Sequence, residues 1–349
     1  MLTARPKLLS VNMRKYNAET DSHLPWLDHT RITALLACPK WGMIRYMEGK
    51  TIEAKRSMAL EAGGALHECF AFHRLHHLFH QQARPDVATR HAAVVYGADK
   101  APQMIQLLEE RNLNAAMLEC LYATGYYNDP NDAKRTLENM EVSLLHYVAN
   151  HDLSLNPIYF DDEFVGIEVP IQFVMEFTYR TAPGGPTSIV RYVYTGRADG
   201  VSYDAQGLII EENKTSTSLA GDWSTQWHTS HQPTGYCVGI GIALGKPCNR
   251  ANIIGLQIKL PRNVLDGYKP VPVERHPRQF NEWVQWVWSA VLVYEANKDA
   301  PAEAPMNTHY CYRYFHPCPF WMMCSGDEET FNDFYSEMVV DQWNPLESD

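Results

Sequence analysis

Apolar residues recur at helical spacing in the first part of the chain. Residues 29–49 predict a helix that is interrupted at Pro39 and carries Cys38 at its middle. Residues 52–82 predict a longer helix, broken only at Gly63-Gly64, where another backbone or a ligand could come close. We therefore expect this part of the chain to be mainly helical.

The pattern changes in the middle of the chain. Helical spacing continues to about residue 150, and we expect residues 83–155 to form a helical insertion. The next segments are rich in β-branched and aromatic residues and predict an antiparallel sheet: residues 158–179, 189–203 and 207–216. A helix at His231–Leu244, a strand at Asn252–Leu260 and a helix at Pro277–Asn297 complete the expected core. We predict an α/β fold with helical decoration, formed as one domain over residues 1–349.

Composition and charge limit the possible classes of protein. The chain has 349 residues, of which 45% are hydrophobic and 20% charged, as is ordinary for a globular protein. Its beginning lacks a continuous apolar leader, and no stretch reaches the roughly 18 apolar residues of a membrane span, so we expect a cytoplasmic protein. A net charge of −11 argues against non-specific coating of nucleic acid but allows one local basic groove.

Two acidic residues are expected to meet on a hairpin. The segment Asp204 to Gly207 suits a tight turn, with Asp first and Gly last. If these two residues pair, Asp199 lies opposite Glu212 and Lys214 shares their face. Two carboxylates and a lysine on an apolar face favour a divalent cation and hydrolysis of a phosphodiester.

Two alternatives apply to this hairpin. A bulge at Gly207 would shift the register by one residue and move the acids to different faces. Without further context, Asp199, Glu212 and Lys214 would be interpreted as an ordinary cross-strand charge cluster.

The cysteines are unevenly distributed. Cys311, Cys318 and Cys324 lie within fourteen residues, whereas Cys38 lies far upstream. The other four are scattered among apolar residues, as buried free thiols usually are: Cys69, Cys120, Cys237 and Cys248. The late group is spaced more widely than the paired C-x-x-C knuckles typical of zinc, and it predicts a metal or cluster site.

Four short segments together resemble the successive motifs of the RecB-like branch of PD-(D/E)XK nucleases. They are Gly64-Ala65-Leu66-His67, Gly196-Arg197-Ala198-Asp199, Glu212-Asn213-Lys214 and Gln232-Pro233-Thr234-Gly235-Tyr236. The resemblance implies a restriction-endonuclease-like core, with a central mixed sheet flanked by helices. It covers roughly residues 30 to 325 apart from the expected insertion.

The resemblance also implies roles for individual residues. His67, Asp199, Glu212 and the Asn213 carbonyl would bind Mg²⁺ or Mn²⁺, and Lys214 would assist the attacking water. Gln232, Tyr236 and Arg197 would contact DNA, and Glu168 could be an accessory acid. Taken alone, His67 is better interpreted as an ordinary core or surface histidine, because the chain has 15 histidines.

The cysteines resemble those of iron–sulfur nucleases of this branch, such as AddB-type proteins and CRISPR adaptation nucleases. Cys38, Cys311, Cys318 and Cys324 would then hold a [4Fe-4S] cluster, with residues 300–330 as a C-terminal staple. The usual second cysteine falls near Phe315, so Cys311 must replace it, and His316 is an alternative ligand. Zinc, or unligated thiols, remains the other interpretation of this group.

These features predict a metal-dependent DNA exonuclease or single-strand nuclease, of phage or bacterial recombination, repair or defence. The chain contains no G-x-x-x-x-G-K-[ST] segment, so any ATP-driven unwinding would come from a helicase or recombination partner. A homo-oligomer is another possible assembly. The competing hypotheses are a DNA-end-binding or assembly factor that cuts little, and a zinc-stapled protein whose hairpin acids are only structural.

Overall fold

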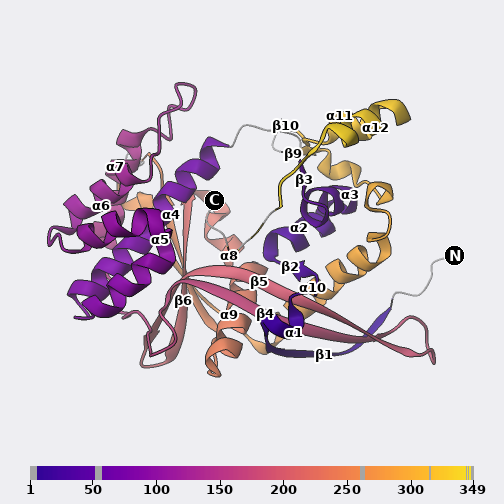
Figure 1. Cartoon of the computed structure of the whole chain (residues 1–349), viewed down its shortest axis with the longest axis horizontal. Coiled ribbons are helices and arrows are strands. Elements are labelled where there is room, and N and C mark those ends of the chain that lie inside the picture. Colours follow the sequence, from indigo (N-terminus) through magenta and orange to yellow (C-terminus); the bar gives the residue numbers. More distant parts are fainter. Residues whose placement is uncertain are drawn as a thin grey trace. The chain divides into compact units, whose positions relative to one another are not determined.

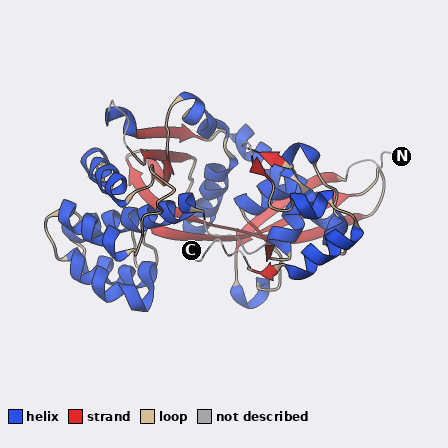
Figure 2. Ribbon diagram, turned by 90° about the horizontal axis from the view of Figure 1, so that it is seen from above, coloured by secondary structure: helices blue, strands red, loops and turns tan. Residues whose placement is uncertain are grey.

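A central mixed sheet with many helices forms this α/β protein (Figures 1 and 2). The computed structural model describes residues 6–51, 57–259, 264–313, 316–342, 344 and 346, without the side chains of residues 313 and 316. The sheet has seven strands in the order β1-β4-β5-β6-β7-β8, and β2 pairs with β5. Its strands are β1 (Lys7–Lys15), β2 (Trp26–Leu27), β4 (Ile167–Arg180), β5 (Thr187–Asp204), β6 (Gly207–Ser216), β7 (Arg250–Gln257) and β8 (Tyr268–Glu274).

The sheet is mixed because its pairings differ in direction. The β5–β6 hairpin and the β7–β8 pair are antiparallel, whereas β6 and β7 run parallel. The parallel pair needs a crossover connection, and this contains α8 (Thr225–Thr229) and α9 (His231–Leu244). The β6 strand, which carries Glu212 and Lys214, is therefore an interior strand of the sheet.

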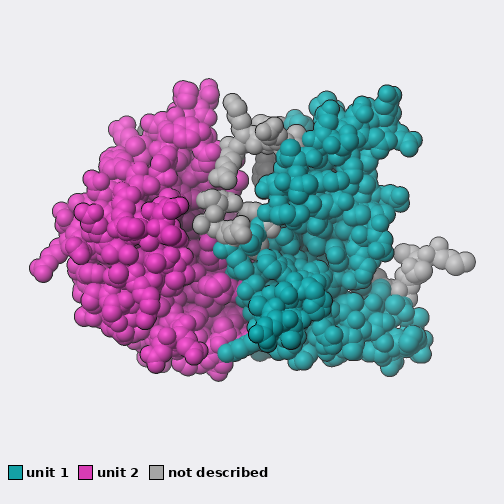
Figure 3. Space-filling model, viewed as in Figure 1, with its two compact units in different colours: residues 1–55, 172–196, 277–347 teal, residues 56–171, 197–276, 348–349 magenta. Residues whose placement is uncertain are grey.

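The chain divides into two compact units, which Figure 3 colours separately. Unit 1 comprises Met1–Lys55, Gln172–Gly196 and Pro277–Glu347, and unit 2 comprises Arg56–Ile171, Arg197–His276 and Ser348–Asp349. The strands β4 and β5 each pass from one unit into the other.

Unit 1 packs around an aromatic core. The helices α2 (His29–Ala37) and α10 (Pro277–Asn297) contact each other. Trp283 of α10 is fully buried, with its ring centroid 5.2 Å from that of Tyr194 on β5. Val287 and Ala290 are also buried, so one face of this helix packs into the core. Unit 1 also contains α3 (Pro39–Gly42), the π-helical turn Met43–Met47, β3 (Lys50–Thr51), β9 (Tyr312–Arg313), β10 (His316–Pro317), α11 (Trp321–Ser325), α12 (Glu328–Glu337) and β11 (Val339–Val340).

Unit 2 holds the largest group of helices. They are α4 (Met58–His80), α5 (Pro85–Leu108), α6 (Leu113–Ala123) and α7 (Leu137–Asn150), so three of them fall within residues 83–155. Their apolar faces share one core with Ile254 and Leu256 of β7. The α4 helix also contacts β6, which brings the helix that carries His67 to the acidic hairpin.

Three local features differ from expectation. Cys38 does not lie inside a helix: its backbone is extended (φ −150°, ψ 106°) between α2 and α3, because proline disfavours helical geometry in the preceding residue. The strands β1 and β8 were not anticipated. The first is polar and exposed along much of its length, and the second contains Pro270 and Pro272, which its position at the sheet edge tolerates.

No helix in the described part of the chain is both long enough and apolar enough to cross a membrane.

Candidate active site and cysteine site

The β5–β6 hairpin has the register that the turn predicts. Asp204 pairs with Gly207, and the ladder continues without a bulge to Gly200 opposite Glu211. One residue further on, Asp199 and Glu212 therefore lie side by side. Both are buried, with 7% and 1% of their surface exposed.

Next to the two acids, backbone N–H groups donate to carboxylates of the opposite strand instead of to its backbone carbonyls. The backbone N–H of Asn213 donates to Oδ2 of Asp199 (2.6 Å), and the N–H of Asp199 points to Oε1 of Glu212 (3.4 Å). These bonds fix each carboxylate against the opposite strand. They also satisfy backbone donors that would otherwise be buried without a partner.

Helix α4 contributes His67 to the same site. Its Nδ1 lies 3.5 Å from Oδ1 of Asp199, and its side chain is 33% exposed. Burial lowers the pKa of His67, but the Asp199 carboxylate outweighs this and raises it overall. The helix continues through Gly63 and Gly64, and a Cβ at Gly63 would lie 3.5 Å from Oγ1 of Thr215, the residue after Lys214. This is an ordinary van der Waals distance, so α4 passes β6 here without requiring a glycine at position 63.

Lys214 pairs with Glu212 through a 3.1 Å contact between Nζ and Oε2. Burial opposes its charge, but Glu212 and Asp199 raise the pKa of Lys214 overall. In the metal-free site Lys214 is therefore protonated at neutral pH. It can neutralise or orient an anion, but it does not serve as a base in this state.

The two acids have different proton affinities. Burial and the neighbouring Asp199 charge raise the pKa of Glu212 to about 7. Burial also opposes ionisation of Asp199, but His67, Lys214 and the Asn213 N–H bring the pKa of Asp199 below its usual range. At neutral pH Asp199 is therefore ionised, whereas Glu212 retains its proton in part.

Glu168 adds a third carboxylate. Burial and the Asp199 charge raise the pKa of Glu168 to about 7, and its carboxylate lies 3.0 Å from Nε of Arg197. Its backbone has a φ of +49°, which is strained for a residue with a side chain. Arg197 remains 30% exposed and can reach an external anion.

The chemistry of these donors fits a hard divalent cation. Oxygen ligands from Asp199 and Glu212, with a nitrogen from His67, suit Mg²⁺ or Mn²⁺. Among the residues that the structure describes, no three His, Cys, Asp or Glu side chains already surround one ion position. Each oxygen of Glu212 already has one partner within the protein, and each keeps a lone pair that a bound ion could use.

The predicted DNA contacts on α9 lie next to each other. Nε2 of Gln232 donates to the Tyr236 hydroxyl (3.1 Å). Gln232 is half-buried and Tyr236 is buried, with 7% of its surface exposed. The α9 helix contacts β6 and β7, so it packs on the part of the sheet that carries Glu212.

Sequence reasoning missed the opposite face of β6. Glu211 is buried and forms an ion pair with the fully buried Arg74 of α4. The Tyr147 hydroxyl of α7 donates to Oδ1 of Asn213 (3.1 Å). In the sequence, Arg74 and Glu211 look like ordinary solvated charges. Only the tertiary structure shows that both are buried.

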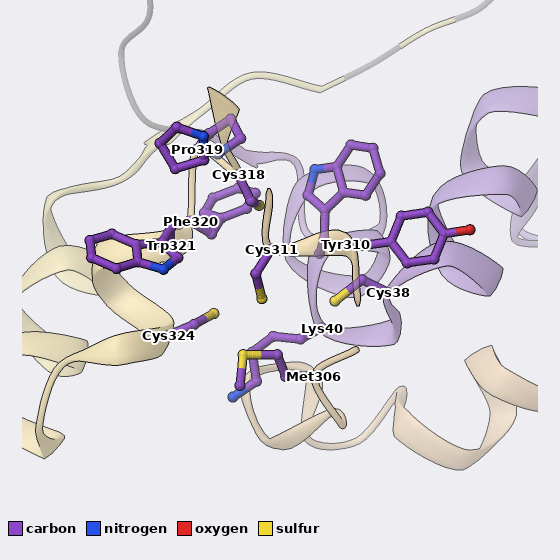
Figure 4. Close-up of a pocket in the computed structure, with 12 residues that line it drawn as sticks. Cys38, Lys40, Met306, Tyr310, Cys311, Cys318, Pro319, Phe320, Trp321 and Cys324 are labelled. Atoms are coloured by element: carbon purple, nitrogen blue, oxygen red, sulfur yellow. The ribbon is translucent and has the colours of Figure 1, made fainter. Parts of the chain in front are cut away.

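The four predicted cluster cysteines line one pocket in unit 1. Figure 4 shows them with the sulfur atoms of Cys38, Cys311 and Cys324 directed into a common space. The pocket has a volume of about 200 Å³ and a mainly apolar lining that includes Trp41 and Phe320. Cys38 enters from the break between α2 and α3, and the others come from the C-terminal segment.

The thiols are close enough to influence one another. Burial raises the pKa of Cys324 to about 11, and the other three cysteines add to the effect, against the opposing charge of Lys40. Sγ of Cys38 accepts the Asn307 N–H (3.5 Å), and the Cys318 N–H donates to the Cys311 carbonyl (2.8 Å). Four thiolates in one apolar pocket would need a compensating positive charge. Phe315 and the side chain of His316 lie outside the described residues.

Comparison with models of known protein families gave no match for this chain. Comparison with curated proteins gave no match either.

Proposed function

We propose that this chain is a metal-dependent nuclease with a PD-(D/E)XK core that hydrolyses phosphodiester bonds in DNA. The observation that carries the proposal is the buried pair Asp199 and Glu212 on one hairpin, with Lys214 beside one acid and His67 beside the other. An ordinary cross-strand charge cluster would be exposed to solvent, whereas these two carboxylates are buried where β5 and β6 stop pairing.

Each residue has a distinct role in this proposal. Asp199, Glu212, His67 and the Asn213 carbonyl would hold Mg²⁺ or Mn²⁺. The bound ion supplies Lewis acidity for the scissile phosphate and its attacking water. The Lys214 ammonium would orient a phosphate oxygen or the water, since the neighbouring carboxylates raise its pKa. Arg197, paired with Glu168, would hold a neighbouring phosphate, and Gln232 with Tyr236 would bind the DNA.

The cysteine pocket would hold a [4Fe-4S] cluster through Cys38, Cys311, Cys318 and Cys324. Four cysteine thiolates suit either an iron–sulfur cluster or a structural zinc ion, and the resemblance to iron–sulfur nucleases favours the cluster. The cluster would contribute chiefly to structure, by joining the break after α2 to the C-terminal segment. Visible absorption and iron content of anaerobically purified protein, against stoichiometric zinc, would decide between the two.

Metal-dependent cutting by the wild type and Lys214→Ala tests the proposed activity. End-labelled single- and double-stranded DNA is incubated with anaerobically purified protein and Mn²⁺ or Mg²⁺. We expect cutting by the wild type, at least a hundredfold slower cutting by Lys214→Ala, and unchanged DNA binding. Lys246→Ala removes an exposed lysine of unit 2 that bonds Tyr159, and this control should cut normally.

DNA binding without cutting by the wild type would overturn the nuclease proposal. That outcome would favour a DNA-end-binding or assembly factor, acting with a helicase or recombination partner. Equal cutting by the wild type and Lys214→Ala would show that Lys214 has no role in the reaction.

A further inference from the structure

A buried ion pair lies directly behind the acidic site. Arg74 of α4 is fully buried, Glu211 of β6 is 1% exposed, and Nη1 of Arg74 donates to Oε2 of Glu211. The Ser202 hydroxyl of β5 donates to the same oxygen (3.2 Å). This pair therefore connects α4 to both strands of the hairpin.

The pair occupies the last rung of the hairpin before the acids. Gly200 pairs with Glu211, follows Asp199 and lies under the guanidinium of Arg74. A Cβ at Gly200 would lie only 2.5 Å from Cζ of Arg74, so the absent side chain makes room for the arginine. Arg74 thus requires glycine at the position next to Asp199.

Helix geometry links this pair to His67. Arg74 follows His67 by seven residues, or two helical turns, which places both on the same side of α4. Fixing Arg74 against Gly200 and Glu211 therefore fixes where α4 presents His67. On the other side of Glu212, the buried Tyr147 hydroxyl holds Asn213.

Stability alone does not account for the pair. Burying two charges costs desolvation energy, and apolar residues of similar size are often equally or more stable. Nε and Nη2 of Arg74 also have no hydrogen-bond partner among the described residues, which adds to that cost. Unlike apolar packing, the directional hydrogen bonds of an ion pair fix how α4 is oriented against the hairpin.

We infer that Arg74 and Glu211 are positioning residues that set His67 against Asp199 and Glu212 for binding of the divalent cation. The inference rests on the proposed function and adds two residues to it. Neither residue touches the cation or DNA in this role. Partners that orient ligands typically change metal affinity about 10- to 100-fold when they are removed.

The test compares Mn²⁺ binding by Arg74→Met with that by Arg74→Met/Glu211→Met. The single variant leaves a buried carboxylate without its partner and should lose stability. The double variant removes both charges, so it should regain the wild-type melting temperature. Both should bind Mn²⁺ about 10- to 100-fold more weakly, with a parallel fall in kcat and an unchanged KM for DNA.

A matched control lies at the far end of the same hairpin. Nη2 of Arg250 contacts Oδ1 of Asp204 at 2.6 Å, and Arg250→Met should leave the affinity for Mn²⁺ unchanged. A double variant with wild-type Mn²⁺ affinity would overturn the inference, and so would failure of both Arg74 variants to fold, which would make the pair purely structural. A wild type that binds Mn²⁺ but cuts no DNA overturns only the nuclease proposal, whereas one that binds no Mn²⁺ overturns both.

Discussion

At the scale of single residues, the proton affinity of Glu212 makes the stability of the protein depend on pH. The pKa of Glu212 is raised from 4.5 to about 7 by burial and by Asp199. Between these pH values the unfolded chain has lost the Glu212 proton while the folded protein retains it. The metal-free protein therefore loses stability as pH rises through this window. Glu168 contributes an effect of the same sign.

We predict that Glu212→Gln reduces this loss of stability. In EDTA, the melting temperature of the variant should fall less than that of the wild type between pH 4.5 and 7. Glu176→Gln, which alters a β4 acid paired with Arg191, should keep the wild-type slope. Equal slopes for Glu212→Gln and the wild type would contradict the assignment.

The same proton affinity predicts the pH dependence of metal binding. A carboxylate ligand must be deprotonated, so wild-type affinity for Mn²⁺ should increase from pH 6 to 8 as Glu212 ionises. Titration calorimetry at these two pH values measures the change. Unchanged affinity would show that Glu212 is not a ligand.

At the scale of secondary structure elements, the break at Pro39 positions the first cysteine. Pro39 keeps Cys38 extended, so that its sulfur enters the pocket instead of following the helix. We predict that Pro39→Ala lets α2 continue and lowers the iron content per chain at least twofold. Iron analysis and visible absorption would measure this, with Pro130→Ala in a loop of unit 2 as the control. Full iron content in Pro39→Ala would show that the break is not needed.

Elements differ in how far their sequences determine them. The α9 and α10 helices have the predicted bounds, and in α10 the apolar residues recur at helical spacing. The edge strand β8 was missed, because two prolines normally argue against a strand and only its place in the sheet makes them acceptable. The Asp199–Glu212 register was predictable from a local turn. The Arg74–Glu211 pair was not, because it joins residues far apart in the chain.

At the scale of the whole molecule, each site belongs to a different unit. The acidic site lies within unit 2, and the four cysteines lie within unit 1. Ligand binding should therefore stabilise the two units separately. We predict that Mn²⁺ slows amide hydrogen exchange in α4 and the β5–β6 hairpin, whereas cluster reconstitution slows it in α2 and α11. Protection of all four elements by either ligand alone would contradict this separation.

The arrangement of unit 1 in three chain segments has a consequence for biosynthesis. Cys38 is made early, but its partners Cys318 and Cys324 belong to the segment that follows residue 276. At about 5–20 residues per second, Cys38 waits roughly 15 to 60 s for the last of them. Throughout that interval its thiol is open to oxidants and competing metals. If these cysteines hold the proposed cluster, its assembly is therefore a late event, which depends on the nascent chain reaching its final segment with Cys38 still reduced.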